Sequence, residues 1–190
     1  RRMKDYLKAH PVTLVFECVD MEQDPHIIEY PENRMILLDI VANRMEYKKY
    51  PYEKLCETAR LLGFACKELA CTLPDWQSFA AWYAKVNEKD YLYEGRRIEG
   101  FVIEDAAGRM VKLKLPYYKF WKQMRGMAEE IAQKGGIDRR HTRLDAEGEA
   151  FCRWATALYQ KEGDKPEPWN ICELRRRFLA EATGNKDRYS

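Results

Sequence analysis

RRIEGFVIEDAAGRMVKLKLPYYKFWK, residues 96–122, carries the clearest strand and turn signals of the chain. Two runs within it, residues 98–104 and 109–115, alternate apolar and polar side chains and include several β-branched residues, a pattern typical of β-strands. The residues between them, 105–108, have the composition of a tight turn and end in glycine. The stretch therefore predicts a β-hairpin.

The pairing within this hairpin decides which side chains share a face. A four-residue loop would place Glu104 opposite Arg109 and, further along, Glu99 opposite Lys114. Because side chains alternate between faces along a strand, one face would then carry Glu99, Phe101, Ile103, Met110, Lys112 and Lys114. A glutamate and a lysine on such a face are often a solvated ion pair. Their apolar neighbours favour a second interpretation, in which the lysines bind an anion such as a nucleotide phosphate.

Two short motifs in the hairpin resemble those of a known family. Residues 99–103 (EGFVI) and 111–114 (VKLK) resemble the last two nucleotidyltransferase motifs of the ATP-dependent ligase superfamily, E-G-[FVY]-[VI] and [VFI]-K-[LI]-K. The short separation of Glu99 and Lys112, and the aromatic residues that follow, are similar to the RNA ligases of phages and of tRNA splicing. The resemblance implies a nucleotidyltransferase fold.

Composition sets only broad limits on function. The 190 residues are 46% hydrophobic and 34% charged, which suits one globular domain, or one domain with a small appendage. The net charge of +2 is too small to identify a nucleic-acid-binding protein. Basic residues nevertheless gather around the hairpin, where residues 96–125 carry 8 basic and 3 acidic side chains. This surplus is compatible with a phosphate-binding surface and also with ordinary solvated lysines.

The sequence shows no pattern typical of a membrane span, a signal peptide or a cysteine-based metal site. The sequence contains no apolar run long enough to span a membrane, and its charged start does not resemble a signal peptide. We therefore expect a soluble, cytoplasmic protein without a membrane partner. Its six cysteines include no C-x-x-C pair, and its three histidines lack the spacing of metal ligands. We expect the cysteines to be reduced and mostly packed inside the fold.

A strong strand candidate precedes the hairpin. Residues 12–19 (VTLVFECV) are apolar on both faces, and Glu17 is the only charged residue among them. A buried carboxylate needs a partner, and the residues alone leave open whether this is a structural hydrogen bond or a ligand hydroxyl. The sequence T-L-V-F-E also resembles the RNA ligase motif whose glutamate reaches the nucleotide ribose, which implies that role for Glu17.

Further strands are expected between this strand and the hairpin. Residues 35–41 predict a buried strand and residues 26–28 a short one. The strand at 35–41 resembles the RNA ligase motif in which an aromatic ring stacks on adenine. Leu38 stands at that place, so the resemblance implies only an apolar wall there.

Helical spacing accounts for most of the remaining chain. It predicts helices at 52–62 before Gly63, after a capping Asp75, from Pro116 onward, at 145–160 and at 171–182. The helix after Asp75 is expected to bury one stripe of residues, namely Trp76, Phe79, Ala80, Tyr83 and Val86. Residues 64–73 are expected to form a strand, residues 166–169 a linker, and residues 184–190 a disordered tail.

Strands thus end near residue 115 and helices follow. We expect an α+β fold, in which residues 1–125 are the antiparallel β-sheet half of a nucleotidyltransferase (adenylation) domain and residues 126–190 a helical C-terminal region. The resemblance implies an ATP-dependent RNA ligase, which joins RNA ends (a 5′-phosphate and a 3′-hydroxyl) through lysyl-adenylate and adenylated-RNA intermediates. In it Glu17 would hold the ribose, Glu99 would bind Mg²⁺ (or Mn²⁺), and Lys112 and Lys114 would neutralise phosphate charge.

One motif of that family is missing. The nucleophilic lysine lies in a K-x-[DNH]-G motif before the glutamate strand, and these 190 residues contain no such motif. We therefore expect the chain to be the C-terminal part of a longer ligase, to need the upstream remainder of the same polypeptide, and not to self-adenylate alone. Two alternatives stay open: a noncatalytic RNA-binding or scaffold module, and a DNA ligase or capping enzyme, in which a β-barrel would follow Lys114.

Overall fold

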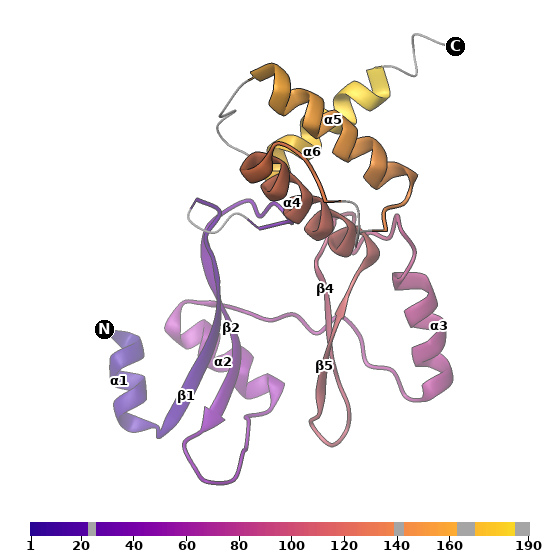
Figure 1. Ribbon diagram of the computed structural model, residues 1–190. Coiled ribbons are helices and arrows are strands. Elements are labelled where there is room, and N and C mark those ends of the chain that lie inside the picture. Colours follow the sequence, from indigo (N-terminus) through magenta and orange to yellow (C-terminus); the bar gives the residue numbers. More distant parts are fainter. Residues whose placement is uncertain (23–25, 139–142, 163–169, 185–190) are drawn as a thin grey trace. The chain divides into compact units, whose positions relative to one another are not determined.

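The computed structural model describes residues 1–22, 26–138, 143–162 and 170–184, and it confirms a mixed α+β fold (Figure 1). The chain divides into two units. Unit 1 comprises residues 1–26 and 30–74, and unit 2 comprises residues 27–29 and 75–190. The predicted linker at 166–169 and the predicted tail from residue 185 lie outside the described residues.

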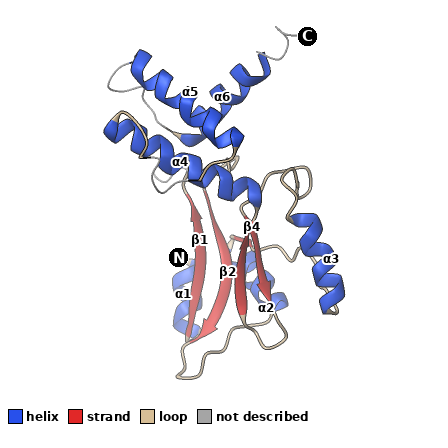
Figure 2. Cartoon of the chain, turned by 45° about the vertical axis from the view of Figure 1, so that its right-hand side comes forward, coloured by secondary structure: helices blue, strands red, loops and turns tan. Residues whose placement is uncertain are grey.

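Unit 1 is built on a three-stranded sheet. Strand β1 (Val12–Val19) runs antiparallel to β2 (Arg34–Ala42), as Figure 2 shows, and the two-residue β3 (Ala65–Cys66) pairs parallel to β2. The strands predicted at 12–19 and 35–41 are confirmed. The predicted strand at 64–73 is reduced to β3, because the Leu69 amide donates to the Tyr52 hydroxyl instead of to a neighbouring strand.

A β-bulge changes which side chains of β2 face the core. The pairing shifts between Val15 and Phe16, and Leu38 is the extra residue on β2. Leu37 and Ile40 can therefore both point into the core in spite of their odd spacing, and they are 0% and 1% exposed. The core of unit 1 joins these two side chains to Tyr6, Val12, Leu55, Ala59 and Leu62.

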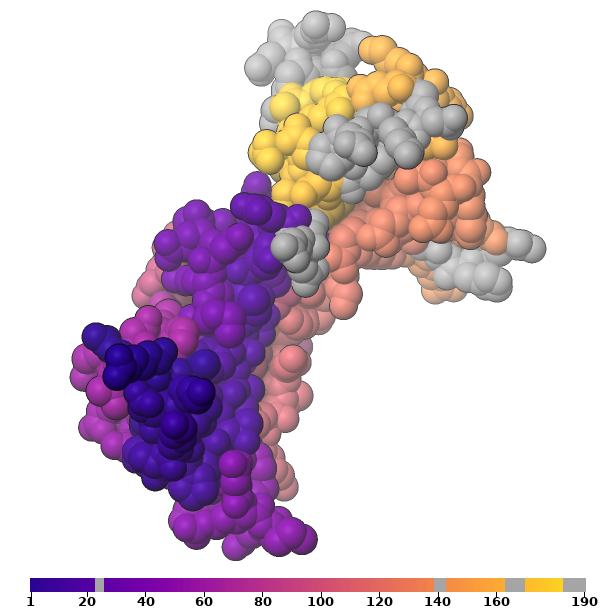
Figure 3. All heavy atoms as spheres, turned by 90° about the vertical axis from the view of Figure 1, so that its left-hand side faces the viewer, coloured from indigo at the N-terminus to yellow at the C-terminus, as the bar shows by residue number. Residues whose placement is uncertain are grey.

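Helices α1 (Arg2–Ala9) and α2 (Tyr52–Leu62) contribute to this core. Tyr6 is the buried residue of α1, and the helix forms part of the surface of unit 1 in Figure 3, where it is darkest indigo. Helix α2 begins and ends where predicted. It ends because Gly63 adopts the left-handed conformation (φ 82°) and donates its N–H to the Ala59 carbonyl.

Unit 2 begins with helix α3 (Trp76–Val86), whose predicted cap is confirmed. Asp75 accepts a hydrogen bond of 2.8 Å from the Ser78 amide. The predicted buried stripe is confirmed at Val86 and wrong at Trp76 and Tyr83, which are 75% and 40% exposed. Trp82 instead packs on the hairpin, so the inward stripe is rotated by about one residue and runs through Phe79, Trp82 and Val86.

The predicted hairpin is present, with β4 (Gly100–Glu104) antiparallel to β5 (Met110–Lys114). Its predicted register is wrong by one residue, because Glu104 pairs with Met110. The loop is one residue shorter than expected: Gly108 donates to the Asp105 carbonyl and adopts a left-handed conformation (φ 78°), which makes a three-residue turn with a glycine bulge.

This slip changes the faces of the hairpin. A shift of one residue moves a strand's side chains to the opposite face relative to its partner. Phe101 therefore pairs with Leu113, and Lys112 pairs with Val102. The prediction that the lysines share a face with Phe101 and Ile103 is wrong.

Three helices complete unit 2: α4 (Pro116–Lys134), α5 (Ala146–Glu162) and α6 (Ile171–Gly184), labelled in Figure 1. They confirm the predicted helical C-terminal region. Aromatic rings hold them together, since the Phe151 ring centroid lies 5.7 Å from that of Trp121 and 5.4 Å from that of Phe178. No helix in the described ranges is long and apolar enough to cross a membrane.

Residues 27–29 join unit 2 through a buried arginine. The strand predicted at 26–28 does not form, although Ile27 and Ile28 are buried. Arg175 of α6 is only 6% exposed and donates to the Ile27 carbonyl at 2.7 Å and to the Glu29 carboxylate at 3.0 Å. Side-chain hydrogen bonds thus replace a strand ladder at this place.

Candidate functional site

The hairpin brings Glu99 to Lys114 through an unusual backbone at Gly100. Gly100 pairs with Lys114 and has a φ of 155°. A Cβ atom at this position would lie 1.9 Å from the Leu113 carbonyl oxygen, so glycine is needed for the two strands to approach. Glu99, one residue before the ladder, then reaches the Lys114 ammonium with its carboxylate.

The ion pair of Glu99 and Lys114 is partly buried. Lys114 Nζ donates to Glu99 Oε2 at 2.5 Å, and the two side chains are 31% and 34% exposed for Glu99 and Lys114 respectively. The same ammonium lies 4.7 Å from the ring centroid of Tyr118, which is buried near the start of α4. The Leu115 amide also donates to the Glu99 carbonyl at 2.9 Å. These contacts fix the ammonium in position, and the Lys114 side chain stays partly exposed.

Lys112 supplies a second cation on the same face of β5. It lies two residues before Lys114, and its ladder partner is Val102, which is 61% exposed. Lys112 is exposed and makes no ion pair within the residues that the structure describes. Lys112 is thus an exposed cation on this face, which by strand alternation also carries the exposed Glu104.

The opposite face of the hairpin is packed against aromatic rings. The Phe101 ring centroid lies 5.0 Å from that of Trp82, 5.7 Å from that of Tyr93 and 6.4 Å from that of Tyr91. Leu113, the ladder partner of Phe101, is half-buried. This packing holds the hairpin in place and directs the face with Lys112 away from the aromatic cluster.

Glu17 belongs to unit 1 and lies on β1, opposite Ile36 of β2. The expectation of a buried carboxylate is wrong, because Glu17 is exposed. Strand alternation places Glu17 on the face of the sheet that is opposite to Leu14 and Phe16, which pack against the core. Glu17 is therefore accessible to a ligand on that face.

An ion pair that the sequence analysis missed lies on the same face as Glu17. Lys67 Nζ donates to Asp39 Oδ1 at 2.8 Å, and the two side chains are 32% and 16% exposed for Lys67 and Asp39 respectively. Lys67 directly follows β3, and its amide donates to the Leu37 carbonyl. Asp39 is the only charged residue among residues 35–41, and such a residue within an apolar strand was a signal that a partner exists.

The structure therefore brings together Glu99, Lys112 and Lys114 in unit 2, whereas Glu17 lies in unit 1. Within the described ranges, no group of three or more His, Cys, Asp or Glu side chains is arranged to hold a metal ion. Glu99 is the only carboxylate among the predicted residues of the hairpin site, so any metal there needs oxygen ligands from substrate or water.

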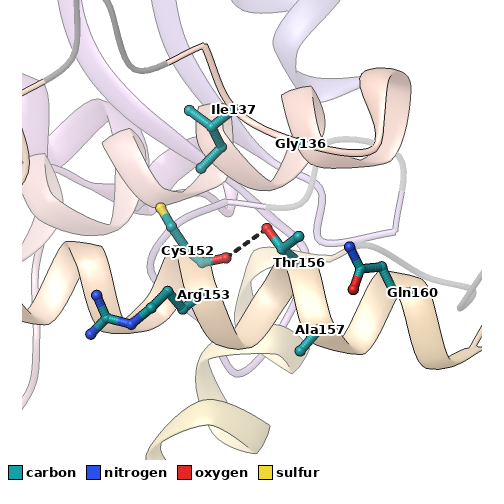
Figure 4. Close-up of a pocket in the computed structure, with 7 residues that line it drawn as sticks. All are labelled: Gly136, Ile137, Cys152, Arg153, Thr156, Ala157 and Gln160. Atoms are coloured by element: carbon teal, nitrogen blue, oxygen red, sulfur yellow. Dashed lines mark hydrogen bonds between the residues drawn. The ribbon is translucent and has the colours of Figure 1, made fainter.

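A cavity of about 310 Å³ lies elsewhere in unit 2, along α5. Figure 4 shows Ile137 on one side of it and Cys152, Thr156 and Gln160 on the other, with the Thr156 hydroxyl donating to the Cys152 carbonyl. No predicted site residue lines this cavity. We therefore place the candidate site on the hairpin, where the charged side chains are, and not in the cavity.

Comparison with known proteins identifies the family of the chain. A family model described as RNA ligase, of the T4 type, matches residues 1–118. The match covers more than half of the chain, includes the strand with Glu17, and continues past the strand with Lys112 and Lys114. No curated protein matches the chain. The chain belongs to the RNA ligase family.

Proposed function

We propose that this chain is part of an ATP-dependent RNA ligase, which seals a 5′-phosphate to a 3′-hydroxyl through lysyl-adenylate and adenylated-RNA intermediates. One observation carries the proposal: within the family match, the E-G and K-x-K motifs place Glu99 against Lys114 and leave Lys112 exposed on the same face of β5. The family membership makes a ligase the first choice among phosphate-handling functions.

Lys112 and Lys114 would bind the phosphates of ATP. Negative charge builds on the α-phosphate oxygens as the nucleotide is transferred, and fixed cations stabilise that charge most where they need no rearrangement. The contact of Lys114 with Glu99 and Tyr118 supports such a fixed position. Lys112, which is free of ion pairs within the described residues, would be the more adaptable of the two cations.

The carboxylate of Glu99 supports a magnesium ion bound together with substrate phosphates and waters. Mg²⁺ commonly keeps several waters and binds through one or two carboxylates together with substrate phosphates, so a cluster of three protein ligands is not required. Glu99 would hold the ion, and Mn²⁺ could replace it. When bound, the ion supplies positive charge to phosphate oxygens. Glu99 itself also orients Lys114 through their hydrogen bond.

Glu17 would accept hydrogen bonds from the ribose hydroxyls of the nucleotide. Its exposed position supports this role, because an acidic side chain on an accessible sheet face can accept from a ligand without displacing a structural partner. The nearby Asp39 and Lys67 neutralise each other, so they would leave the charge of Glu17 unopposed on this face.

The nucleophilic lysine would come from outside these 190 residues, because no K-x-[DNH]-G motif occurs among them. On this proposal residues 1–125 complete a nucleotidyltransferase domain begun by an upstream remainder of the polypeptide, and residues 126–190 form a helical C-terminal region. The helices α4, α5 and α6 support an RNA ligase over a DNA ligase or capping enzyme, for which a β-barrel was expected after Lys114.

A sealing assay on the complete gene product tests the proposal. The substrate is a nicked or looped RNA with a labelled 5′-phosphate and a 3′-hydroxyl, incubated with ATP and Mg²⁺. We expect the label to become resistant to phosphatase in an ATP-dependent manner. RNA binding without any sealing, across several RNA structures, would instead support the noncatalytic module.

A further inference from the structure

Two cysteine thiols of unit 1 lie in contact. Cys56 Sγ, on α2, is 3.3 Å from Cys66 Sγ, at the end of β3. Both side chains are half-buried, and all six cysteines are free thiols. A disulfide bond is about 2.05 Å long, so the two sulfur atoms need to approach by only about 1 Å to form one.

The backbone around both cysteines is held by specific hydrogen bonds. The N–H groups of Gly63 and Phe64 both donate to the Ala59 carbonyl at 2.9 Å, so the chain turns directly from α2 into β3. Cys66 pairs with Leu37 of β2 and is thereby anchored to the sheet. The contact between the thiols thus follows from the path of the backbone and is not a chance encounter of two mobile side chains.

A second set of hydrogen bonds clamps the segment after β3 to α2. The Tyr52 hydroxyl donates to the Lys67 carbonyl at 3.1 Å and accepts from the Leu69 amide at 3.2 Å. Helix α2 and the segment after β3 are therefore already joined on one side of the thiol pair. Closing a disulfide between them requires little further ordering of the chain.

We propose that Cys56 and Cys66 are a modification site that forms a reversible disulfide by exchange with a small-molecule disulfide of the glutathione type. One protein thiolate attacks a sulfur of the small disulfide and releases one small thiol. The second protein thiolate then attacks the mixed disulfide, which forms the Cys56–Cys66 bond and releases the other small thiol. Two electrons pass from the protein to the small disulfide, and the two released thiolates take up the two protons.

The environment of Cys66 disfavours its thiolate. Burial, followed by the hydrogen bond with Cys56, raises the pKa of the Cys66 thiol. Because the thiolate is the form that attacks a disulfide, the raised pKa slows the reaction of Cys66 and does not prevent it.

Closing the disulfide would tie α2 to the strand that leads into Lys67. Lys67 follows Cys66 directly and pairs with Asp39 on the sheet face that carries Glu17. The inference does not depend on the proposed function, since it rests only on the two thiols and the backbone that holds them.

Oxidation of the purified chain tests the proposal. The chain is incubated with oxidised glutathione, remaining thiols are alkylated, and the peptides are mapped by mass spectrometry. We expect a mass lower by two hydrogen atoms and a cross-linked peptide pair that contains Cys56 and Cys66. The exposed Cys18 and Cys71 report whether the reagent is active. If these two react while Cys56 and Cys66 are recovered without a cross-link, the proposal is overturned.

Variants provide a second measurement. Cys56→Ser and Cys66→Ser should each abolish the loss of two hydrogen atoms, whereas the matched control Cys71→Ser, at an exposed position, should retain it. The unfolding temperature should rise by several degrees on oxidation of the unsubstituted chain and stay unchanged in Cys56→Ser. An equal rise in Cys56→Ser would contradict the assignment to this pair. The peptide map of the unsubstituted chain remains decisive even where a variant folds poorly.

Discussion

Glu99 and Lys114 form an ion pair of 2.5 Å although they are not partners in the strand ladder, where Gly100 takes the place opposite Lys114. The contact therefore depends on the backbone at Gly100, which lets the carboxylate of the preceding residue reach across. A Cβ atom at residue 100 would collide with the Leu113 carbonyl, so the second position of the E-G motif requires glycine.

Gly100→Ala should therefore disrupt the hairpin. The clash with backbone and the unfavourable φ together should cost about 3 kcal/mol or more of the free energy of unfolding. Urea unfolding and hydrogen exchange of the β4 amides both measure the effect. Gly126→Ala is the control, because Gly126 lies within α4 with open space around it. This substitution should raise the free energy of unfolding by about 0.5–1 kcal/mol. An equal and small effect of both substitutions would contradict the assigned role of Gly100.

The turn of the hairpin should show a dependence on pH. Hydrogen bonds from the Arg109 amide and then from its guanidinium lower the pKa of Asp105 below its ordinary value of 3.8. A lowered pKa in the folded state means that the carboxylate stabilises the protein above pH 3.8 and that this contribution is lost as the pH falls through the folded value.

Asp105→Asn isolates this charge, since asparagine keeps an oxygen that can accept from the Ala107 and Arg109 amides. Unfolding should show the unsubstituted chain as the more stable of the two at neutral pH, with the difference shrinking in acid below pH 3.8. A difference that stays constant across this range would rule out the charged form as its source.

Arg175 should contribute strongly to the stability of unit 2. Arg175→Ala leaves the Ile27 carbonyl with only the weak thiol donor of Cys172 at 3.8 Å and removes the buried partner of Glu29, and should cost about 1.5–3 kcal/mol. Arg176→Ala is the matched control, because its side chain is 62% exposed and its ion pairs should contribute under about 1 kcal/mol. Thermal unfolding of the two variants compares them directly. Equal losses would mean that burial of Arg175 is not what matters.

The chain of 190 residues should not label itself with AMP. Incubation with α-labelled ATP and Mg²⁺ should leave no covalent label on the protein, because the sequence lacks the K-x-[DNH]-G motif. Denaturing electrophoresis followed by autoradiography measures the result. Covalent labelling of one of its lysines would show that another residue serves as nucleophile.

Several elements were predictable because local signals agree with one another. Helix α2 has regular apolar spacing and a glycine stop, and β1 has an apolar run of the right length. The hairpin register was not predictable, because the composition of residues 105–109 allows a loop of three or four residues. Which one forms depends on whether Gly108 enters the left-handed bulge position. The face of α3 was missed for a similar reason, since stripes through Trp76 and through Trp82 both have helical spacing.

The sequence predicts the part of the candidate site that depends on residues close together along one strand. Lys112 and Lys114 share a face by alternation alone, whatever the register. The contact between Glu99 and Lys114 was expected from a ladder pairing that does not occur, and arises instead from the backbone at Gly100. The ion pair of Lys67 with Asp39 could not be predicted from the sequence, because it depends on the parallel pairing of β2 with β3, which are separated by a helix along the chain.

The central claim is that the hairpin handles the phosphates of ATP, and the most direct measurement is transfer of labelled AMP to protein in the complete gene product. Lys112→Ala, Lys114→Ala and Glu99→Ala should each lower the rate of labelling by about 100-fold or more. Lys85→Ala, at an exposed position near the end of α3, is the control and should label normally. Circular dichroism verifies that each variant is folded. Normal labelling in folded Glu99→Ala and Lys112→Ala variants would contradict the account.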